Sequence, residues 1–195
     1  MRIGLILTLL LLLPAPAWAD ASASTTVDAA PKDPESARQQ NLDTLLGKLH
    51  NASPHMDVSR IEQEIWDIWS RNASPTAEVL LRESSAAISA GDYDPAEQML
   101  SQLVETYPTF AEAWNRRASL YYLLRRFDAA MIDIEKALEL EPRNFGALVG
   151  KGMILHAQHK TDAALAAFKE ALAINPHLQV VRDEIKLIEN QEPHV

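Results

Sequence analysis

The sequence predicts an all-α protein built as an α-solenoid of antiparallel helix pairs. Two residue types recur at a fixed interval, and a period of 34 residues is typical of a repeated helix–turn–helix unit. The prolines of this period are Pro108, Pro142 and Pro176, and the alanines are Ala96, Ala130 and Ala164. Apolar residues spaced three and four apart lie between these markers, which is the pattern of a helix with one buried face.

The first helix of each unit is predicted from a large residue at the fourth position and a small one at the eighth. The large residues are Leu80, Trp114 and Leu148, and the small ones are Ser84, Ala118 and Gly152. Small residues are expected where two helices approach closely. The second helix is expected to start just after a recurring aspartate, whose carboxylate can cap free backbone N–H groups, and to end before the recurring proline. The aspartates are Asp94, Asp128 and Asp162.

The middle unit carries residues that resemble the tetratricopeptide repeat (TPR) family. They are Trp114, Ala118, Tyr121, Ala130, Ala137 and Pro142. The resemblance implies three units, at 77–110, 111–144 and 145–178. One departure recurs: the seventh position, usually leucine in the family, is Glu83, Arg117 and Lys151. We expect the methylene groups of these side chains to cover the core while their charges stay in water.

Residues 1–19 have the features of a secretory signal peptide. Arg2 is followed by a short apolar run, and Ala17-Trp18-Ala19 matches an A-x-A cleavage site. Cleavage after Ala19 and a periplasmic location are therefore expected, with no membrane insertion of the cleaved chain. Residues 20–36, rich in Ala, Ser, Thr and Pro, are expected to form a flexible tether.

Residues 37–76 predict a further helix pair, a degenerate repeat or cap. Its first helix carries a leucine stripe, and its second, from about Val58 to Arg71, is apolar over a wide arc. That arc predicts that the second helix is sandwiched between the first helix and the first clear repeat, with Trp66 and Trp69 in the core. At the other end, 179–190 is expected to be an amphipathic capping helix, followed by a tail at 191–195.

Composition and motifs exclude several classes of function. The net charge is −9, which disfavours nucleic-acid binding because phosphate contacts need clustered Lys and Arg. The sequence has no nucleophile elbow, zinc-protease motif or phosphate-binding glycine loop, so we expect neither catalysis nor a cofactor. His156 and His159 are three residues apart but have no clear third ligand, so a metal or small-ligand carrier is kept only as an alternative.

The resemblance implies that the first helices of successive units line a concave groove that holds a partner's peptide or helix. Carried over by repeat position, the groove residues are Glu78, Leu81, Ser85, Ile88, Glu112, Asn115, Ser119, Tyr122, Val149, Met153 and His156. Gly146 takes the corresponding second position of the third unit. The family's chaperone-tail subgroup clamps a terminal carboxylate with Lys and Asn, whereas Leu81 and Ser85 stand at the first such pair here.

These observations favour a periplasmic, non-catalytic adaptor or scaffold whose groove binds a segment of another envelope protein. The mixed apolar and polar groove suits an extended or helical segment with small apolar anchors. A self-associating structural protein, pairing through Trp66, Trp69 or the end helices, is the alternative from a different class. The oligomeric state is expected to be a monomer or a weak homo-oligomer.

Overall fold

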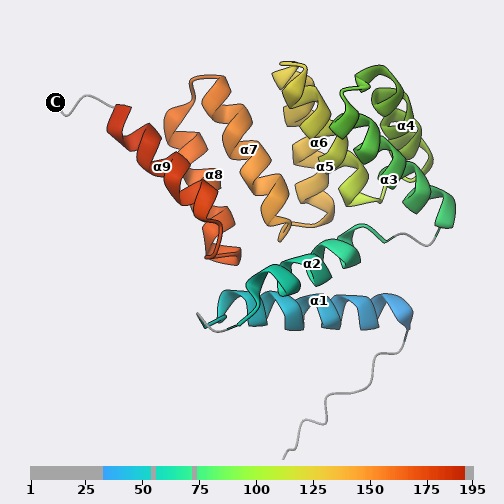
Figure 1. The fold of residues 1–195 in the computed structure, drawn as a ribbon, viewed down its shortest axis with the longest axis horizontal. Coiled ribbons are helices and arrows are strands. Elements are labelled where there is room, and N and C mark those ends of the chain that lie inside the picture. Colours follow the sequence, from blue (N-terminus) through green and yellow to red (C-terminus); the bar gives the residue numbers. More distant parts are fainter. Residues whose placement is uncertain (1–32, 54–55, 72–73, 192–195) are drawn as a thin grey trace, which may run out of the picture. The chain divides into compact units, whose positions relative to one another are not determined.

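A computed structural model describes residues 33–53, 56–71 and 74–191. Over these residues the chain forms nine α-helices and no strand, which confirms the predicted all-α helix-pair architecture (Figure 1). The helices are α1 (Pro34–His50), α2 (Val58–Trp69), α3 (Pro75–Ala90), α4 (Tyr93–Thr106), α5 (Ala111–Leu123), α6 (Phe127–Leu140), α7 (Phe145–Ala157), α8 (Thr161–Ile174) and α9 (Gln179–Gln191). The expected signal peptide, residues 20–32 of the expected tether and residues 192–195 lie outside the described residues.

Three antiparallel pairs, α3/α4, α5/α6 and α7/α8, follow the 34-residue period. The recurring alanines, Ala96, Ala130 and Ala164, are all fully buried. At Gly152 α7 and α8 approach closely, because an added Cβ would lie 2.4 Å from a ring atom of Phe168. Each recurring proline stands two residues beyond the end of a second helix, where it cannot interrupt the hydrogen-bond ladder.

The recurring aspartates do not act as the N-caps that the sequence predicted. Asp94, Asp128 and Asp162 lie inside the first turn of α4, α6 and α8, and none of these helices has a side-chain cap. The helices begin one residue earlier than each aspartate. A carboxylate in the first turn still interacts favourably with the positive end of the helix dipole.

Arg117 also departs from its predicted role. Its guanidinium donates two hydrogen bonds to the carboxylate of Asp133 on α6, at 2.7 and 2.9 Å, and Asp133 is 1% exposed. The same guanidinium lies 5.2 Å from the ring centre of Trp114 and 5.5 Å from that of Tyr121. The charge is therefore held between α5 and α6, where we had expected it to stay in water.

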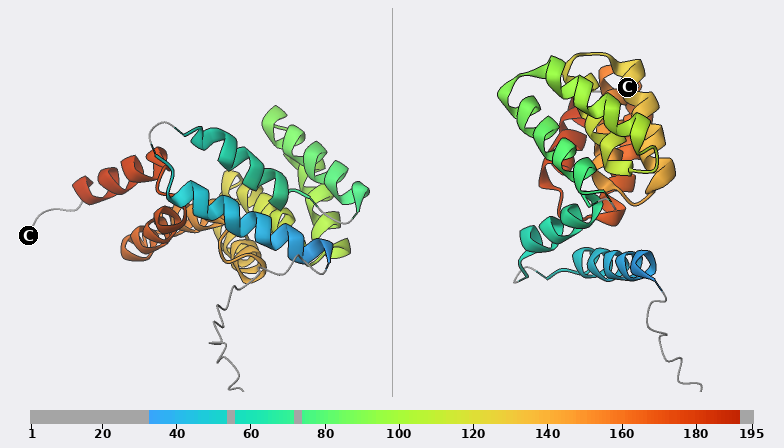
Figure 2. Two further views of the ribbon diagram at one scale, coloured as in Figure 1. Left: turned by 90° about the horizontal axis from the view of Figure 1, so that it is seen from below. Right: turned by 90° about the vertical axis from the view of Figure 1, so that its right-hand side faces the viewer.

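The N-terminal helices α1 and α2 form a hairpin with its own core, and they lie side by side in both views of Figure 2. Asp33 caps α1 by accepting a hydrogen bond from the Ser36 N–H at 2.8 Å, and Pro34 occupies the first turn. The predicted leucine stripe of α1 is buried against three isoleucines of α2. These core residues are Leu42, Leu45, Leu46, Leu49, Ile61, Ile65 and Ile68.

The apolar arc of α2 packs against the third repeat, and the prediction that it packs against the first repeat is wrong. Its aromatic side chains contact Phe145, the first residue of α7 in the third unit, with ring centres 5.4 Å away for Trp66 and 5.1 Å for Trp69. Gly146 makes this contact possible, because a Cβ there would lie 2.4 Å from the Trp66 ring. Both tryptophans thus contribute to a core within one chain, and Trp69 is only 5% exposed. The Trp69 ring is therefore packed within its own chain.

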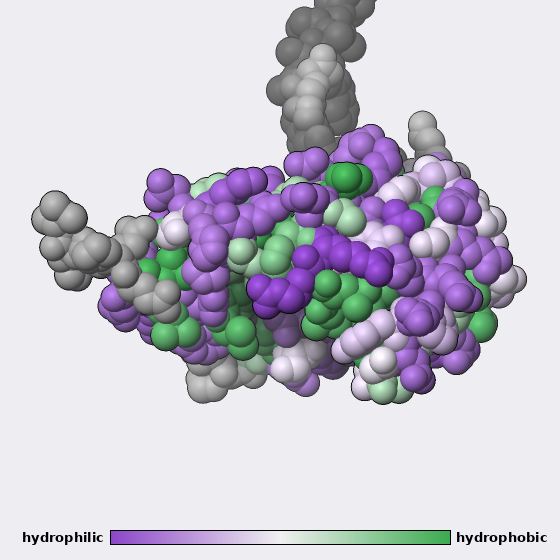
Figure 3. All heavy atoms as spheres, turned by 90° about the horizontal axis from the view of Figure 1, so that it is seen from above, coloured by the Kyte–Doolittle hydropathy of each residue, from purple (hydrophilic) through white to green (hydrophobic). Residues whose placement is uncertain are grey.

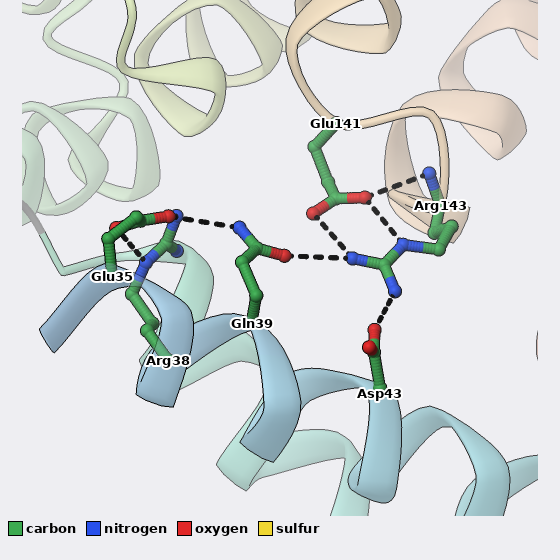
Figure 4. A network of polar contacts seen from close by, with 6 residues as sticks. All are labelled: Glu35, Arg38, Gln39, Asp43, Glu141 and Arg143. Atoms are coloured by element: carbon green, nitrogen blue, oxygen red, sulfur yellow. Dashed lines mark hydrogen bonds and ion pairs between the residues drawn. The ribbon is translucent and has the colours of Figure 1, made fainter. Parts of the chain in front are cut away.

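Polar contacts join the hairpin to the connections between repeats. Arg143, between α6 and α7, donates to Asp43 and, at 3.0 Å, to the Gln39 side-chain oxygen on α1 (Figure 4). Glu141 accepts a further bond from the same guanidinium at 3.0 Å. Near α9, Asn175 donates to Glu62 at 2.6 Å. The hairpin is therefore held by polar contacts as well as by its aromatic side chains.

Helix α9 closes the repeat array at its C-terminal end. Val181 and Ile188 are buried in one cluster with Phe168 of α8, while Val180 and Leu187 are exposed. Across the described ranges, no helix has the length and apolar character needed to cross a bilayer.

Candidate functional site

The predicted groove residues lie on α3, α5 and α7, the first helices of the three repeats, but several are not at the surface. Leu81 is 4% exposed, Glu112 is fully buried and Asn115 is 6% exposed. Glu78, Ser85, Ile88, Tyr122, Val149 and His156 are half-buried, and Ser119 and Met153 are exposed. Of the predicted residues, Leu81, Glu112 and Asn115 therefore have little surface available for contact with another molecule.

Glu112 is buried because its carboxylate is fully used within α5. One oxygen accepts a hydrogen bond from the Asn115 amide at 2.9 Å, and the other accepts from Arg116 at 2.5 Å. A buried carboxylate is tolerated only when it is paired in this way. Glu112 is thus used within α5, where it holds the Arg116 side chain, which is 34% exposed.

An apolar cleft of about 260 Å³ lies between α5, α6 and α7. It brings together three of the predicted groove residues with five that the prediction missed. The lining residues are Ala118, Ser119, Tyr122, Leu123, Ile134, Gly150, Met153 and Ile154. Leu123 is 51% exposed and Met153 is 40% exposed, so the cleft mouth is apolar as well as its floor. A cleft with this lining can take up an aliphatic or aromatic side chain.

A second, polar cleft of about 430 Å³ lies where α2 meets α3 and α5. It contains the predicted residues Glu78, Leu81 and Ser85. The other lining residues are Asp67, Ser70, Arg71, Arg82 and Arg116. The contributions of α2 were missed because the repeat register says nothing about where a non-repeated helix lies. No signal in the sequence could have supplied them.

Five of the predicted residues line neither cleft: Ile88, Glu112, Asn115, Val149 and His156. His156 has a buried Nδ1 without a hydrogen-bond partner in the described part of the chain, and His159 lies in the following turn with φ 60°. Within the described ranges, no three His, Cys, Asp or Glu side chains are grouped so that they could hold a metal ion.

The surface seen from above the view of Figure 1 is mixed in character. Apolar areas lie on both sides of a strongly hydrophilic band (Figure 3). The exposed large apolar side chains are correspondingly scattered over several helices, with Leu123 on α5, Ile132 on α6 and Met153 on α7. Such a surface favours a partner that places single apolar side chains between polar contacts.

Comparison with known proteins places all three repeats in one family. Tetratricopeptide repeat models match residues 78–109, 111–144 and 133–178. A TPR repeat-containing protein of Rhizobium etli is 29% identical over 167 residues, which cover 86% of this chain and 82% of that protein.

Solved structures agree on the fold. The first TPR domain of Spaghetti (RPAP3), bound to an HSP90 peptide, aligns with a TM-score of 0.58 at 24% identity, covering 60% of this chain and 93% of that one. MamA aligns with a TM-score of 0.55 at 21% identity, covering 70% of this chain and 85% of that one. The three matched repeats, the buried alanines at their fixed positions and the paired helices show that the chain belongs to the tetratricopeptide repeat family, whose members are protein-interaction modules.

Proposed function

We propose that this protein is a non-catalytic interaction module that binds a peptide or helical segment of another protein. The segment lies on the inner face of α5 and α7, which is the face that carries Ser119, Tyr122 and Met153. The observation that carries the proposal is the apolar cleft between these helices, with Leu123 and Met153 exposed at its mouth. The RPAP3 domain, which is similar in fold, was solved with a bound peptide, and this supports the same use of the fold here.

The chemistry of the cleft restricts the segment that fits. Its volume of about 260 Å³ suits one large aliphatic or aromatic side chain. Tyr122 at the same cleft supplies a hydroxyl group that can hydrogen-bond the segment's backbone, and the Ser119 Oγ, which donates to the Asn115 carbonyl at 3.0 Å, can still accept. An apolar anchor with a backbone contact beside it is a common mode of peptide recognition.

A blocking substitution tests the proposal. Peptides would be selected from a random display library on the purified protein, and their Kd measured by fluorescence anisotropy. Ser119→Arg places a long charged side chain at the cleft without disturbing the core, since Ser119 is exposed. Ile132→Arg is the matched control, because Ile132 is 66% exposed on the outer helix α6.

We expect Ser119→Arg to weaken peptide binding about tenfold or more, as expected for loss of a buried apolar anchor, and Ile132→Arg to leave it unchanged. Selected peptides that bind both variants with equal affinity would place the binding surface elsewhere. Failure to select any peptide would also count against the proposal.

The cellular setting is part of the same proposal. The charged start, apolar run and A-x-A site of residues 1–19 support export, and periplasmic partners would then be envelope proteins. N-terminal sequencing of the protein isolated from its source checks this. We expect the chain to begin at Asp20, and an intact Met1 end would contradict export by cleavage.

A further inference from the structure

The sulfur atoms of this sequence all belong to methionine, because it contains no cysteine. The structure describes four of the methionines: Met56, Met99, Met131 and Met153. Met56 is 41% exposed and Met153 is 40% exposed, whereas Met99 and Met131 are half-buried. A thioether is oxidised to a sulfoxide where an oxidant can reach it, so Met56 and Met153 are expected to react before the other two.

Met153 differs from Met56 in what surrounds it. It lies on α7 and lines the apolar cleft between α5, α6 and α7, together with Leu123 and Ile154. Met56 lies in the connection between α1 and α2 and is not among the lining residues of this cleft. The two side chains are therefore matched in exposure, and only Met153 belongs to the surface that we propose binds a protein segment.

Oxidation of Met153 changes the chemistry of the cleft mouth. A thioether packs well against aliphatic and aromatic groups, whereas a sulfoxide is polar and its oxygen needs a hydrogen-bond donor when it is removed from water. The Ser119 hydroxyl already donates to the Asn115 carbonyl at 3.0 Å, which leaves the Tyr122 hydroxyl as the side-chain donor at this cleft. The sulfoxide oxygen and the backbone of a bound segment therefore compete for one hydroxyl, and the apolar anchor of the segment loses an apolar surface to pack against.

The fold does not depend on the Met153 sulfur. In the described part of the chain, the buried clusters of the repeats do not include Met153, whereas Met131 packs against two of them. A sulfoxide at Met131 would place a polar group against the core, and a sulfoxide at Met153 changes only the surface. Binding can therefore be lost in a protein that stays folded.

We propose that Met153 is a reversible oxidation site that controls binding at the apolar cleft, an inference that rests on the proposed function. The oxidant is a peroxide, which transfers one oxygen atom to the thioether sulfur. The S–O bond forms as the O–O bond breaks, so the sulfur is oxidised and hydrogen peroxide is reduced to one water. Methionine sulfoxide reductases restore the thioether, with the oxygen leaving as water while a dithiol is oxidised to a disulfide.

Treatment of the purified protein with hydrogen peroxide, stopped with catalase, tests this proposal. Mass spectrometry of proteolytic fragments measures the sulfoxide at each methionine, and circular dichroism checks that the oxidised protein stays folded. Fluorescence anisotropy then measures the Kd of a peptide selected on the untreated protein and containing no methionine. Met153→Leu keeps an apolar side chain of similar volume that peroxide does not oxidise. Met56→Leu is the matched control, because Met56 has nearly the same exposure and lies outside the cleft.

We expect peroxide to oxidise Met153 and Met56 before Met99 and Met131. It should weaken peptide binding about tenfold in the wild type and equally in Met56→Leu, as expected for loss of an apolar contact. Met153→Leu should bind like untreated wild type and keep its affinity after treatment. Methionine sulfoxide reductases with dithiothreitol should restore binding by the oxidised wild type.

An unchanged Kd in wild-type protein with Met153 oxidised would overturn this inference and leave the proposed function standing. It is also overturned by an equal loss of binding in Met153→Leu and wild type, or by a Met153 that resists peroxide when Met56 is oxidised. Absence of peptide binding before any treatment would contradict the proposed function itself, and this inference with it.

Discussion

Arg117 and Asp133 show how one residue pair can replace an apolar contact between the two helices of a repeat. The Arg117 side chain is 15% exposed and the Asp133 side chain 2% exposed, so both ends of the ion pair are largely removed from water. The pKa of Arg117 is raised, first because Asp133 accepts its hydrogen bonds. Removing one member of such a pair leaves the other charge buried, which costs more than the pair itself contributes.

We therefore expect Arg117→Leu, which restores the usual family residue, to lower the free energy of unfolding by about 3 kcal/mol, because Asp133 stays buried without a partner. Urea unfolding followed by circular dichroism measures the change. The double variant Arg117→Leu with Asp133→Leu should recover to within about 1 kcal/mol of wild type. A single variant as stable as wild type would show that the ion pair is not holding α5 to α6.

Glu35 offers a second test at a single residue. Hydrogen bonds donated by Arg38, and then by Gln39, lower its pKa to about 2 from an ordinary 4.5. The folded protein therefore gains stability from this carboxylate above pH 4.5, and the gain is lost as the pH falls towards 2. Because the Glu35 side chain is 64% exposed, solvent screening keeps this contribution small.

Carboxyl NMR titration of Glu35 measures this pKa directly. We expect a midpoint near 2 in the wild-type protein. In Arg38→Gln, which removes the first donor, the midpoint should move up towards the ordinary value. A wild-type midpoint near 4.5 would contradict the hydrogen-bonded arrangement.

At the scale of helices, the repeated pairs could be predicted from sequence and the position of the hairpin could not. Alanine, proline and apolar positions recur with the repeat, so each pair is specified by local spacing. The hairpin has no such register. Its placement depends on the packing of the Trp66 ring over Gly146. These two residues are 80 positions apart in the chain, and no sequence pattern indicates that they are in contact.

The same limit applies to the candidate site. Ser119, Tyr122 and Met153 could be assigned to the groove by repeat position, whereas Asp67, Ser70 and Arg71 enter through the hairpin. The burial of Glu112 also could not be predicted from the sequence, because it depends on the particular hydrogen bonds that Asn115 and Arg116 donate to it.

Gly146→Ala tests the placement of the hairpin. An added Cβ would lie 2.4 Å from the Trp66 ring, so the ring must move, and we expect a loss of about 1–3 kcal/mol in the free energy of unfolding. Hydrogen exchange should become faster in α1 and α2 and change little in α5 and α6. Gly47→Ala is the control, since nothing lies within 4 Å of its added Cβ. Replacing this mid-helix glycine by alanine should raise the free energy of unfolding by up to about 1 kcal/mol. Equal stability and exchange for Gly146→Ala and wild type would contradict the contact.

At the scale of the whole described molecule, three clefts have different chemistry. The cleft of α5, α6 and α7 is apolar, and the cleft lined by the end of α2, α3 and α5 contains arginines and acids. The third is lined by the start of α1, the end of α2, the connection between α4 and α5, and the end of α6. The hairpin contributes residues to the last two and none to the first. Binding of a protein segment to the inner face of α5 and α7 should therefore persist in Gly146→Ala if the repeats remain folded.

Peptide binding at the inner face of α5 and α7 is tested most directly by methyl NMR. A peptide selected on the protein would be titrated into samples labelled at Leu, Ile and Met methyl groups. We predict the largest shift changes at Leu123, Met153 and Ile154, which line the apolar cleft, with little change at Ile61 and Ile65 in the hairpin core. Changes concentrated in the hairpin or at Ile132 on α6, with the cleft methyl groups unaffected, would contradict binding at this face.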